Sequence, residues 1–406
     1  MMRRRIDFVY ITVMQNIKHP ILLQNCLLGL VLILLTVFMY NHPQVFPMHG
    51  YSGPSGVVVS PANARLTGDS WRYISGGAAI LYGQPLDDVQ RAYSGYCLLY
   101  GLFNEMIVIV QVLFALVALI AVTALGRRLA GNAGGWLAGA LFALNPEFAA
   151  WHCAIMTESV YTSCVCISAF LALWATEHTR LIRMPIAFMF FVLTAFLRPT
   201  GWILLPATLI FWCCMCLKKT WMKATASVLV ACAFVIITTT FASGDIGQQS
   251  PVMKLYTGEV IWQEELWRVD MPPADMSRMA IADGLLYGLR HPLASGWLML
   301  KRMFVMLLRI RPSYSLLHNL FLLAFHLPIT VFGIASFILL RRSAVTWAIA
   351  AMFFSHALVV ALTFNDNDGR FTLYFTPLLA TAAVSVVVFS WVGRNVRLVG
   401  DNNEHI

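Results

Sequence analysis

Long runs of apolar residues recur along the whole chain, and they constrain its fold more than any other feature of the sequence. Each run approaches the roughly 20 residues that an α-helix needs to cross a bilayer. The runs are continuous rather than alternating, which excludes a transmembrane β-barrel. Only 12% of the 406 residues are charged, about half the fraction of a typical soluble protein. The sequence therefore predicts one integral membrane domain over residues 1–406, folded as an all-α polytopic transmembrane helical bundle.

About ten crossings are predicted, each from a run of apolar residues of near-spanning length. The segment 184–197 is short for a full crossing, so we expect its outer end to stop within the membrane. The first long run follows an arginine cluster and lacks a cleavage pattern, so it is predicted to be a retained anchor. The ten segments are 21–41, 106–125, 129–145, 157–175, 184–197, 201–217, 224–242, 316–340, 344–364 and 371–391.

The basic residues are distributed unevenly between the two sides of this topology. With the N-terminus inside, 15 of the 28 basic residues and four of the 19 acidic residues lie on the inner face. An excess of Lys and Arg marks the cytoplasmic side, so both ends of the chain are predicted to be cytoplasmic. The apolar segment 297–310 is interrupted by Lys301, Arg302 and Arg309. We therefore predict an amphipathic helix in the outer interface, before the eighth span.

Two long external regions, residues 42–105 and 243–315, hold most of the polar residues that could bind a substrate. In the first, Asp69 precedes Arg72 and Tyr73 and a helix-like segment rich in small residues, which predicts external juxtamembrane helices. Asp69 is a candidate catalytic acid, and Arg72 and Tyr73 are candidates for contact with the substrate. The alternative is that Asp69 only caps the helix that follows it.

Further charged residues lie at the outer ends of predicted spans. Glu158 begins the fourth span, where a carboxylate is costly unless it faces a cavity or a partner; the alternative is solvation in a short loop. Arg198, Arg370, Lys301 and Arg302 are candidates for binding a lipid phosphate, because guanidinium and ammonium groups make charge-assisted hydrogen bonds to phosphate. The alternative, strongest for Lys301 and Arg302, is that they anchor helix ends at the interface.

The sequence lacks the patterns of several other kinds of site. No phosphate-binding glycine loop, Ser-His-Asp arrangement or dinucleotide fingerprint occurs in a suitable context, which argues against nucleotide chemistry. The net charge of +9 is explained by membrane orientation, so we predict no nucleic-acid partner. No cofactor is assigned with certainty. A divalent cation between Asp69 and Glu158 is left open, although two carboxylates alone fall short of a hard-cation site.

The order of these residues resembles that of GT-C glycosyltransferases of the protein-mannosyltransferase and aminoarabinose-transferase type, over about residues 20 to 391. The matching pieces are Asp69 with Trp71 to Tyr73, Gly126 to Gly131, Asn145 with Pro146, Thr157 with Glu158, Leu197 to Gly201, His291 with Pro292 ahead of Lys301 and Arg302, and Asp368 to Phe371. The chain departs from the pattern at Ser70, where many relatives have a second acid, and at Phe371, which replaces a frequent Tyr. It also lacks the long C-terminal soluble domain of some relatives.

The resemblance implies a membrane enzyme that moves a sugar from a polyprenyl-phosphate donor to a glycan, lipid or protein acceptor, with inversion at the anomeric carbon. It implies Asp69 as general base, Glu158 as a second acid, and Arg198 and Arg370 at the donor phosphate. The expected location is a bacterial inner membrane with the site facing the periplasm. Two other functions remain open: a lipid-linked oligosaccharide polymerase or ligase, and a transporter or flippase, which would more often carry mid-span charges and inverted repeats.

Overall fold

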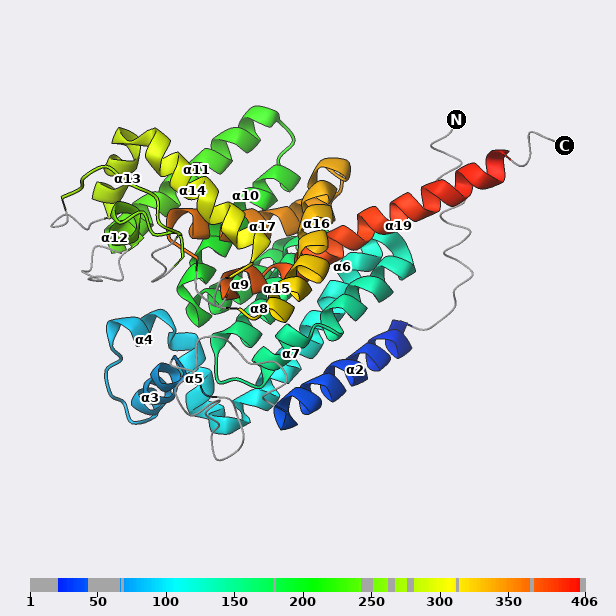
Figure 1. Ribbon diagram of the computed structural model, residues 1–406, viewed down its shortest axis with the longest axis horizontal. Helices are drawn as coiled ribbons and strands as arrows, with labels where there is room; N and C mark the ends of the chain where they lie inside the picture. The colour runs from blue at the N-terminus through cyan, green and yellow to red at the C-terminus, as the bar shows by residue number, and fades with distance from the viewer. Residues whose placement is uncertain are drawn as a thin grey trace.

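The computed structural model is built from α-helices that follow one another closely along the chain (Figure 1). The part of the chain that it describes comprises residues 21–42, 66, 69–177, 180–241, 251–261, 267–275, 281–311, 314–365 and 369–401. Within those ranges the only β-type pairing is a single bridge between Ile261 and Asn365. The all-α prediction is thereby confirmed.

Six helical segments in the described ranges are long and apolar enough to cross a membrane. They are α2 (Ile21–Asn41), α6 (Ile107–Ala143), α8 (Thr157–Trp174), α10 with the 3₁₀ turn before it (Pro199–Cys216), α15 with α16 (Leu316–Leu339) and α17 (Ala344–Leu362). The chain is therefore a multi-pass membrane protein. Three further predicted crossings coincide with α9 (Arg180–Leu197), α11 (Thr220–Phe241) and α19 (Thr376–Asp401); the total of ten crossings stays a prediction.

The segment labelled α6 contains two of the predicted crossings, folded against each other. Its backbone leaves the helical conformation at Ala130 and at Gly131, where φ is +67°, a left-handed value that glycine adopts without steric cost. The two arms meet closely, because a methyl group added at Gly126 would lie 2.7 Å from the carbonyl oxygen of Gly134. The two arms of α6, one on each side of this turn, thus form an antiparallel helical hairpin.

The core of the bundle surrounds α8. In the 18-residue apolar stretch of α8 that could cross the membrane, 83% of the residues are buried inside the protein. The corresponding share for the peripheral α2 is 28%. Helix α6 packs on α2, α8 and α19, while α16 and α17 both contact α19. Many leucines of α2 stay exposed, as expected where a helix faces lipid rather than protein.

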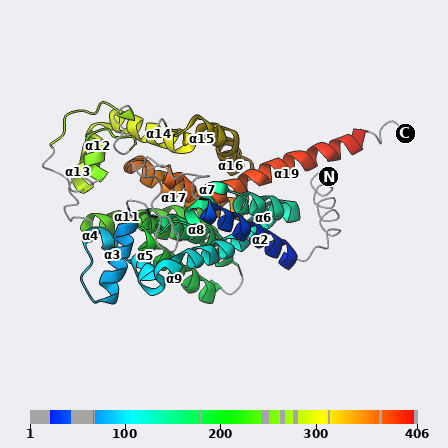
Figure 2. The same ribbon diagram turned by 60° about the horizontal axis from the view of Figure 1, so that its bottom comes forward.

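Several charged residues that the predicted topology places on the inner side, among them Arg127, Arg128, Glu177 and Arg183, gather at one end of the bundle. Glu177 pairs with Arg128 and with Arg183, and the guanidinium of Arg127 donates to the side-chain oxygen of Gln24 at 2.8 Å. The C-terminal end of α19 lies toward the same end, whereas the external helices lie at the opposite end (Figures 1 and 2). The inner and outer groups are therefore separated as the topology predicts; which side faces the cytoplasm stays a prediction.

From residue 69 onward, where the structure describes it continuously, the first external region contains the α-helices α3 (Ser70–Leu81), α4 (Asp88–Ala92) and α5 (Ser94–Phe103). Helices α3 and α5 pack backbone to backbone, since a methyl group at Gly77 would lie 2.8 Å from the amide nitrogen of Gly101. The small residues between Ser75 and Ala79 permit this approach. This packing fixes the start of α3, and with it Asp69, against the bundle.

The second external region contains α12 (Pro251–Tyr256), α13 (Ile281–Arg290) and α14 (Pro292–Leu308). Helix α14 exposes the stripe Leu293, Trp297, Leu300 and Phe304, each at least 60% accessible. These residues recur at helical spacing. The stripe is the apolar face expected of a helix lying in a membrane interface.

The remaining helices are short and join the larger ones. Helix α7 (Pro146–His152) precedes α8, α15 (Leu316–Phe321) begins the segment that continues as α16 (Leu327–Leu339), and α18 (Arg370–Leu373) precedes α19. Between α15 and α16 the residues Leu322–His326 wind as a π-helix. Helix α7 carries Glu147 and helix α18 carries Arg370, two of the charged residues described below.

Candidate functional site

Two acidic and two basic residues from four distant segments meet at the outer end of the bundle. The Nη1 of Arg370 lies 3.1 Å from Oδ2 of Asp69 and 3.5 Å from Oε1 of Glu158. The Nη1 of Arg198 lies 2.7 Å from the same Oε1. We call Asp69, Glu158, Arg198 and Arg370 the charged cluster. All four were predicted from the sequence, and the structure brings them together.

Asp69 is the acid of the cluster that solvent reaches. Its side chain is 34% exposed, whereas that of Glu158 is 0% exposed. Asp69 directly precedes α3 but makes no side-chain capping bond, so its carboxylate is not used to cap the helix. The neighbouring Ser70 donates to the carbonyl oxygen of Ile155 at 3.0 Å, which ties the start of α3 to the chain just before α8.

Arg72 belongs to the rim of the charged cluster. Its Nη1 lies 3.5 Å from Oδ1 of Asp69, and its side chain is 29% exposed. The guanidinium carbon also lies 5.7 Å from the centre of the Tyr93 ring. Arg72 and Arg370 thus approach different oxygens of one carboxylate. Among the described residues of the site, the three arginines Arg72, Arg198 and Arg370 face the two acids Asp69 and Glu158.

Glu158 is enclosed by donors from three elements. Besides the two arginines, the hydroxyl of Tyr374 donates to Oε1 at 3.4 Å and that of Thr157 to Oε2 at 3.4 Å. A buried carboxylate needs such partners, because an uncompensated buried charge is costly. Glu158 therefore holds the arginines in place, and the open Asp69 is the better placed of the two acids to meet a substrate.

Aromatic rings surround Arg198. Its guanidinium carbon lies 4.9 Å from the ring centre of Tyr374, 5.5 Å from Phe371 and 5.9 Å from Tyr93. Rings at these distances attract a cation and exclude water from it. Tyr374 and Tyr93 were missed by the sequence analysis; the aromatic residues that follow Arg370 in the chain were the available signal.

The charges around Asp69 set its protonation state. Burial raises the pKa of this carboxyl, but the charges of Arg370 and Arg72 outweigh that effect, so its pKa lies below the usual 3.8. Asp69 is therefore ionised at neutral pH. The stability that this pairing contributes is present above the pKa of the unfolded state and is lost as the pH falls through the depressed pKa of the folded state.

As the described residues form it, the charged cluster lacks a suitable place for a divalent cation. The Nη1 of Arg370 occupies the space between the carboxylates of Asp69 and Glu158, where a bridging ion would have to sit. A hard cation would also need more oxygen ligands than two carboxylates supply. Within the described residues, no group of three or more His, Cys, Asp or Glu side chains is arranged to hold a metal.

Three of the predicted site residues are not members of the charged cluster. Arg302 is fully buried and donates to the backbone carbonyls of Lys254, Glu259 and Ala361, so its guanidinium is committed to the fold. Lys301 donates to the carbonyl of Arg268 at 3.2 Å. Tyr73 is 1% exposed and packs edge-on against Tyr93 and Tyr96, so it belongs to the core of the first external region.

Asp366 and Asp368 precede Arg370 in the sequence and were expected to help hold it, but they lie outside the described residues. Among the described residues, Arg370 is held by Asp69 and Glu158. The structure also shows a second buried ion pair nearby, between Glu147 of α7 and Arg309 at the end of α14. The sequence signal for that pair was the presence of charged residues beside apolar segments.

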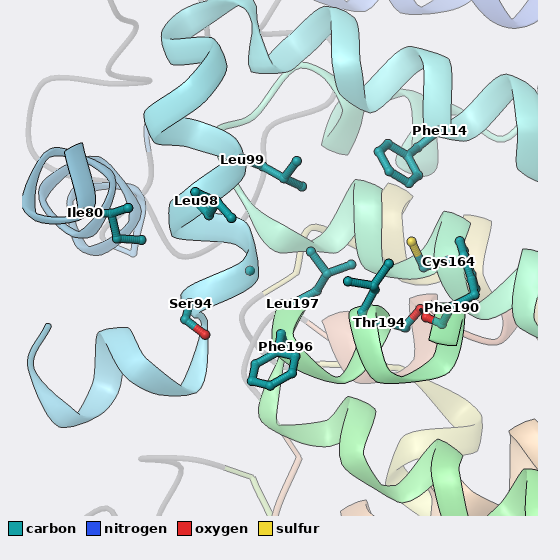
Figure 3. Close-up of a pocket in the computed structure, with 12 residues that line it drawn as sticks. Ile80, Ser94, Leu98, Leu99, Phe114, Cys164, Phe190, Thr194, Phe196 and Leu197 are labelled. Atoms are coloured by element: carbon teal, nitrogen blue, oxygen red, sulfur yellow. Dashed lines mark hydrogen bonds between the residues drawn. The ribbon is translucent and has the colours of Figure 1, made fainter. Parts of the chain in front are cut away.

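The structure also contains an apolar groove of about 470 Å³ (Figure 3). It lies between α5 and α9, with contributions from α3, α6 and α8, and is lined by residues including Leu98, Phe114, Phe190 and Leu193. Its lining residues Ser94 and Leu197 directly precede or follow Tyr93 and Arg198 of the site. Two of the lining residues are therefore next in the chain to residues of the site, and the rest of the lining is mostly apolar.

The chain was compared with known families, curated proteins and solved structures. No family model matches it, and no curated protein matches it. One solved structure that it resembles is the oligosaccharyltransferase of Archaeoglobus fulgidus, in complex with zinc and sulfate. The likeness covers 91% of this chain and 50% of the other, at 13% sequence identity and a TM-score of 0.39. The chain spans about half the length of that oligosaccharyltransferase.

Proposed function

We propose that this protein is a membrane glycosyltransferase that moves a sugar from a polyprenyl-phosphate donor to the hydroxyl of a glycan, lipid or protein acceptor. The observation that carries the proposal is the pairing of a solvent-accessible carboxylate, Asp69, with Arg370. An apolar groove whose lining includes Ser94 and Leu197, next in the chain to Tyr93 and Arg198, supports it. A carboxylate can accept the proton of an attacking hydroxyl, and a guanidinium can stabilise charge on a leaving phosphate. The groove matches the lipid part of such a donor.

The proposed reaction is a single displacement at the anomeric carbon. The acceptor hydroxyl loses its proton to Asp69 and forms the new bond to that carbon. The bond from the anomeric carbon to the phosphate oxygen breaks, and the electron pair leaves with the polyprenyl phosphate. Arg370 and Arg72, which both reach Asp69, balance the charge of the leaving group, and the anomeric configuration inverts. Glu158 and Arg198 keep this arrangement in place.

Donor binding is expected to make Asp69 a stronger base. In the free protein, Arg370 and Arg72 hold its pKa below 3.8, which favours the carboxylate but weakens its pull on a proton. A donor phosphate competes with Asp69 for these guanidinium groups, because phosphate binds arginine strongly. The pKa of Asp69 should therefore rise when the donor is bound.

This competition predicts two different acid limits in the pH–rate profile. The profile of kcat/KM reports the free protein and that of kcat reports the substrate complex. Activity should be lost with falling pH in both, but kcat should fall at a higher pH than kcat/KM. Arg72→Gln removes a charge that lowers the pKa of Asp69, so it should move the kcat/KM limit upward. If the acid limits of kcat and kcat/KM coincide, and Arg72→Gln does not move the kcat/KM limit, this role for Asp69 is contradicted.

The apolar groove is proposed to hold the polyprenyl chain of the donor. Leu98 lines it, whereas Leu102, one turn along α5, does not. Both leucines are exposed, by 44% and 61%, so either position accepts a larger side chain without disturbing the core. Leu98→Trp would fill the groove, and Leu102→Trp is the matched control.

Leu98→Trp is expected to raise the KM for a long-chain donor by about tenfold, equivalent to ~1.4 kcal/mol of binding energy. A donor with a short prenyl chain, which occupies less of the groove, should be affected less. The measurement is initial-rate kinetics with the two donors in detergent or nanodiscs. An equal rise in KM for both donors, or the same rise in Leu102→Trp, would remove the groove from the proposal.

The choice of donor separates this function from that of a lipid-linked oligosaccharide polymerase or ligase. Purified protein should transfer labelled sugar from a polyprenyl monophosphate carrier to endogenous acceptors in membrane extracts. A polymerase or ligase would instead consume a diphosphate-linked oligosaccharide. Transfer from the diphosphate carrier alone would reject the proposed donor class and favour the alternative.

A further inference from the structure

Glu147 and Arg309 form an ion pair that is almost completely hidden from solvent. The two side chains are 7% and 1% exposed. Both terminal nitrogens of Arg309 donate to the carboxylate, one of them at 2.7 Å. The partners stand 162 residues apart in the chain. Such a pair is costly to bury and is often replaceable by apolar residues without loss of stability, so its presence beside a polar site calls for a role other than stability.

The pair lies against the residue that precedes Arg370. Gly369 is the N-cap residue of α18, and its φ is +62°. A methyl group added there would lie 3.1 Å from Nε of Arg309 and 3.2 Å from the hydroxyl oxygen of Tyr314. The side chain of Arg309 therefore lies directly against the backbone next to Arg370, at a distance that leaves little room for a side chain larger than that of glycine.

Arg309 also adopts a backbone conformation that is unfavourable for its residue type. It ends α14 with φ at +58°, in the left-handed region that non-glycine residues rarely occupy. Strain of this kind persists only where the surroundings hold it. Glu147 fixes the side chain of Arg309, because its carboxylate accepts hydrogen bonds from both terminal nitrogens of the Arg309 guanidinium. The same helix end fixes α18 from a second direction, since Thr372 donates to the carbonyl of Met306 at 2.9 Å.

We propose that Glu147 and Arg309 are positioning residues, which place Arg370 where it can reach both Asp69 and Glu158. Glu147 fixes the guanidinium of Arg309, Arg309 fixes the backbone at Gly369, and Gly369 fixes the start of α18. The inference rests on the proposed function for its kinetic consequence, but its geometric content is independent of the reaction. Neither residue touches the substrate in this arrangement.

The first test is structural and uses the full chain in lipid nanodiscs. Arg309→Lys keeps the positive charge but cannot bind both oxygens of Glu147 as a planar guanidinium does. A cryo-electron microscopy structure of this variant should show Arg370 displaced from Asp69. Gly369→Ala provides a second variant, because it leaves the ion pair in place and crowds the same contact from the other side. If Arg370 keeps its native position beside Asp69 in the variants that fold, the inference is overturned.

The second test is a double-mutant cycle with donor kinetics. Arg309→Lys should lower kcat on the order of a hundredfold, as small misplacements of catalytic groups do, with little change in the KM for the donor. If Arg309 acts through Arg370, the same change should cost little further in an Arg370→Ala background. Equal losses in both backgrounds would show a merely structural role and overturn the inference.

Arg302→Lys is the matched control, since Arg302 is a fully buried arginine of the same helix that binds backbone carbonyls rather than Glu147. Its effects should be independent of Arg370. A native protein that transfers no sugar from the donor would defeat the proposed function, and the position of Arg370 in the Arg309→Lys structure would still decide the inference.

Discussion

Replacing Asp69 by Asn is expected to reduce sugar transfer by roughly a hundred- to ten-thousand-fold, the contribution usual for a general base. Asn keeps the shape of the side chain and one oxygen that can accept from Arg370, so the fold should be retained. It cannot take up the proton of the acceptor hydroxyl. The measurement is the rate of transfer from a labelled polyprenyl-phosphate sugar, with thermal unfolding as the check on folding.

Asp88→Asn is the control for this variant. Asp88 lies in the same external region, but its side chain is 87% exposed and pairs only with Arg91 on the surface. Surface pairs of this kind contribute little, so transfer should stay at the native rate. Native transfer by folded Asp69→Asn would remove Asp69 from the chemistry.

Arg370→Ala is the second variant with a large expected effect. Loss of one preorganised donor to a developing negative charge typically costs on the order of a hundred- to a thousandfold in kcat. The loss should appear mainly in kcat, because the charge on the leaving phosphate grows in the transition state. Arg370→Lys should recover part of the activity, since it restores a charge without the planar geometry that reaches two carboxylates.

The matched control for Arg370 is Arg91→Ala, which removes a 67% exposed arginine from the same side of the protein. Both variants lower the net charge equally, so a purely long-range effect on an anionic donor would slow them alike. A loss confined to Arg370→Ala assigns the effect to contact with the donor. Equal rates in Arg370→Ala and the native protein would contradict the proposed role of Arg370.

The helices were predictable because a single physical requirement, the length of an apolar run, specifies them. The predicted segment 21–41 and the observed α2 share the same bounds, and the segment 344–364 differs from α17 by two residues. The turn within α6 was predicted to within a few residues, since the second run was expected to begin at 129 and the backbone turns at Ala130 and Gly131. The first external helices were predicted only in outline, because short helices outside the membrane carry weaker signals.

Glu158, Arg198 and Arg370 were predictable because charges at the edge of hydrocarbon are costly and therefore informative. Asp69 was identified by its place in the first external region and by the family resemblance. What the sequence could not provide was the partner of each charge. Arg302 and Arg309 stand in one short segment and look alike in sequence, yet one binds backbone carbonyls and the other Glu147. Tyr73 likewise stood beside Asp69 in the sequence but turned toward the core. These outcomes depend on packing between segments far apart in the chain.

The most direct test is a structure of the protein in nanodiscs with a polyprenyl phosphate bound, which represents the product lipid of the proposed reaction. The phosphate is predicted to lie within hydrogen-bond distance of Arg370, beside Asp69, with the prenyl chain in the groove between α5 and α9. A phosphate bound instead at Lys301 on the outer face of α14, with Arg370 still paired to Asp69, would contradict the proposed site.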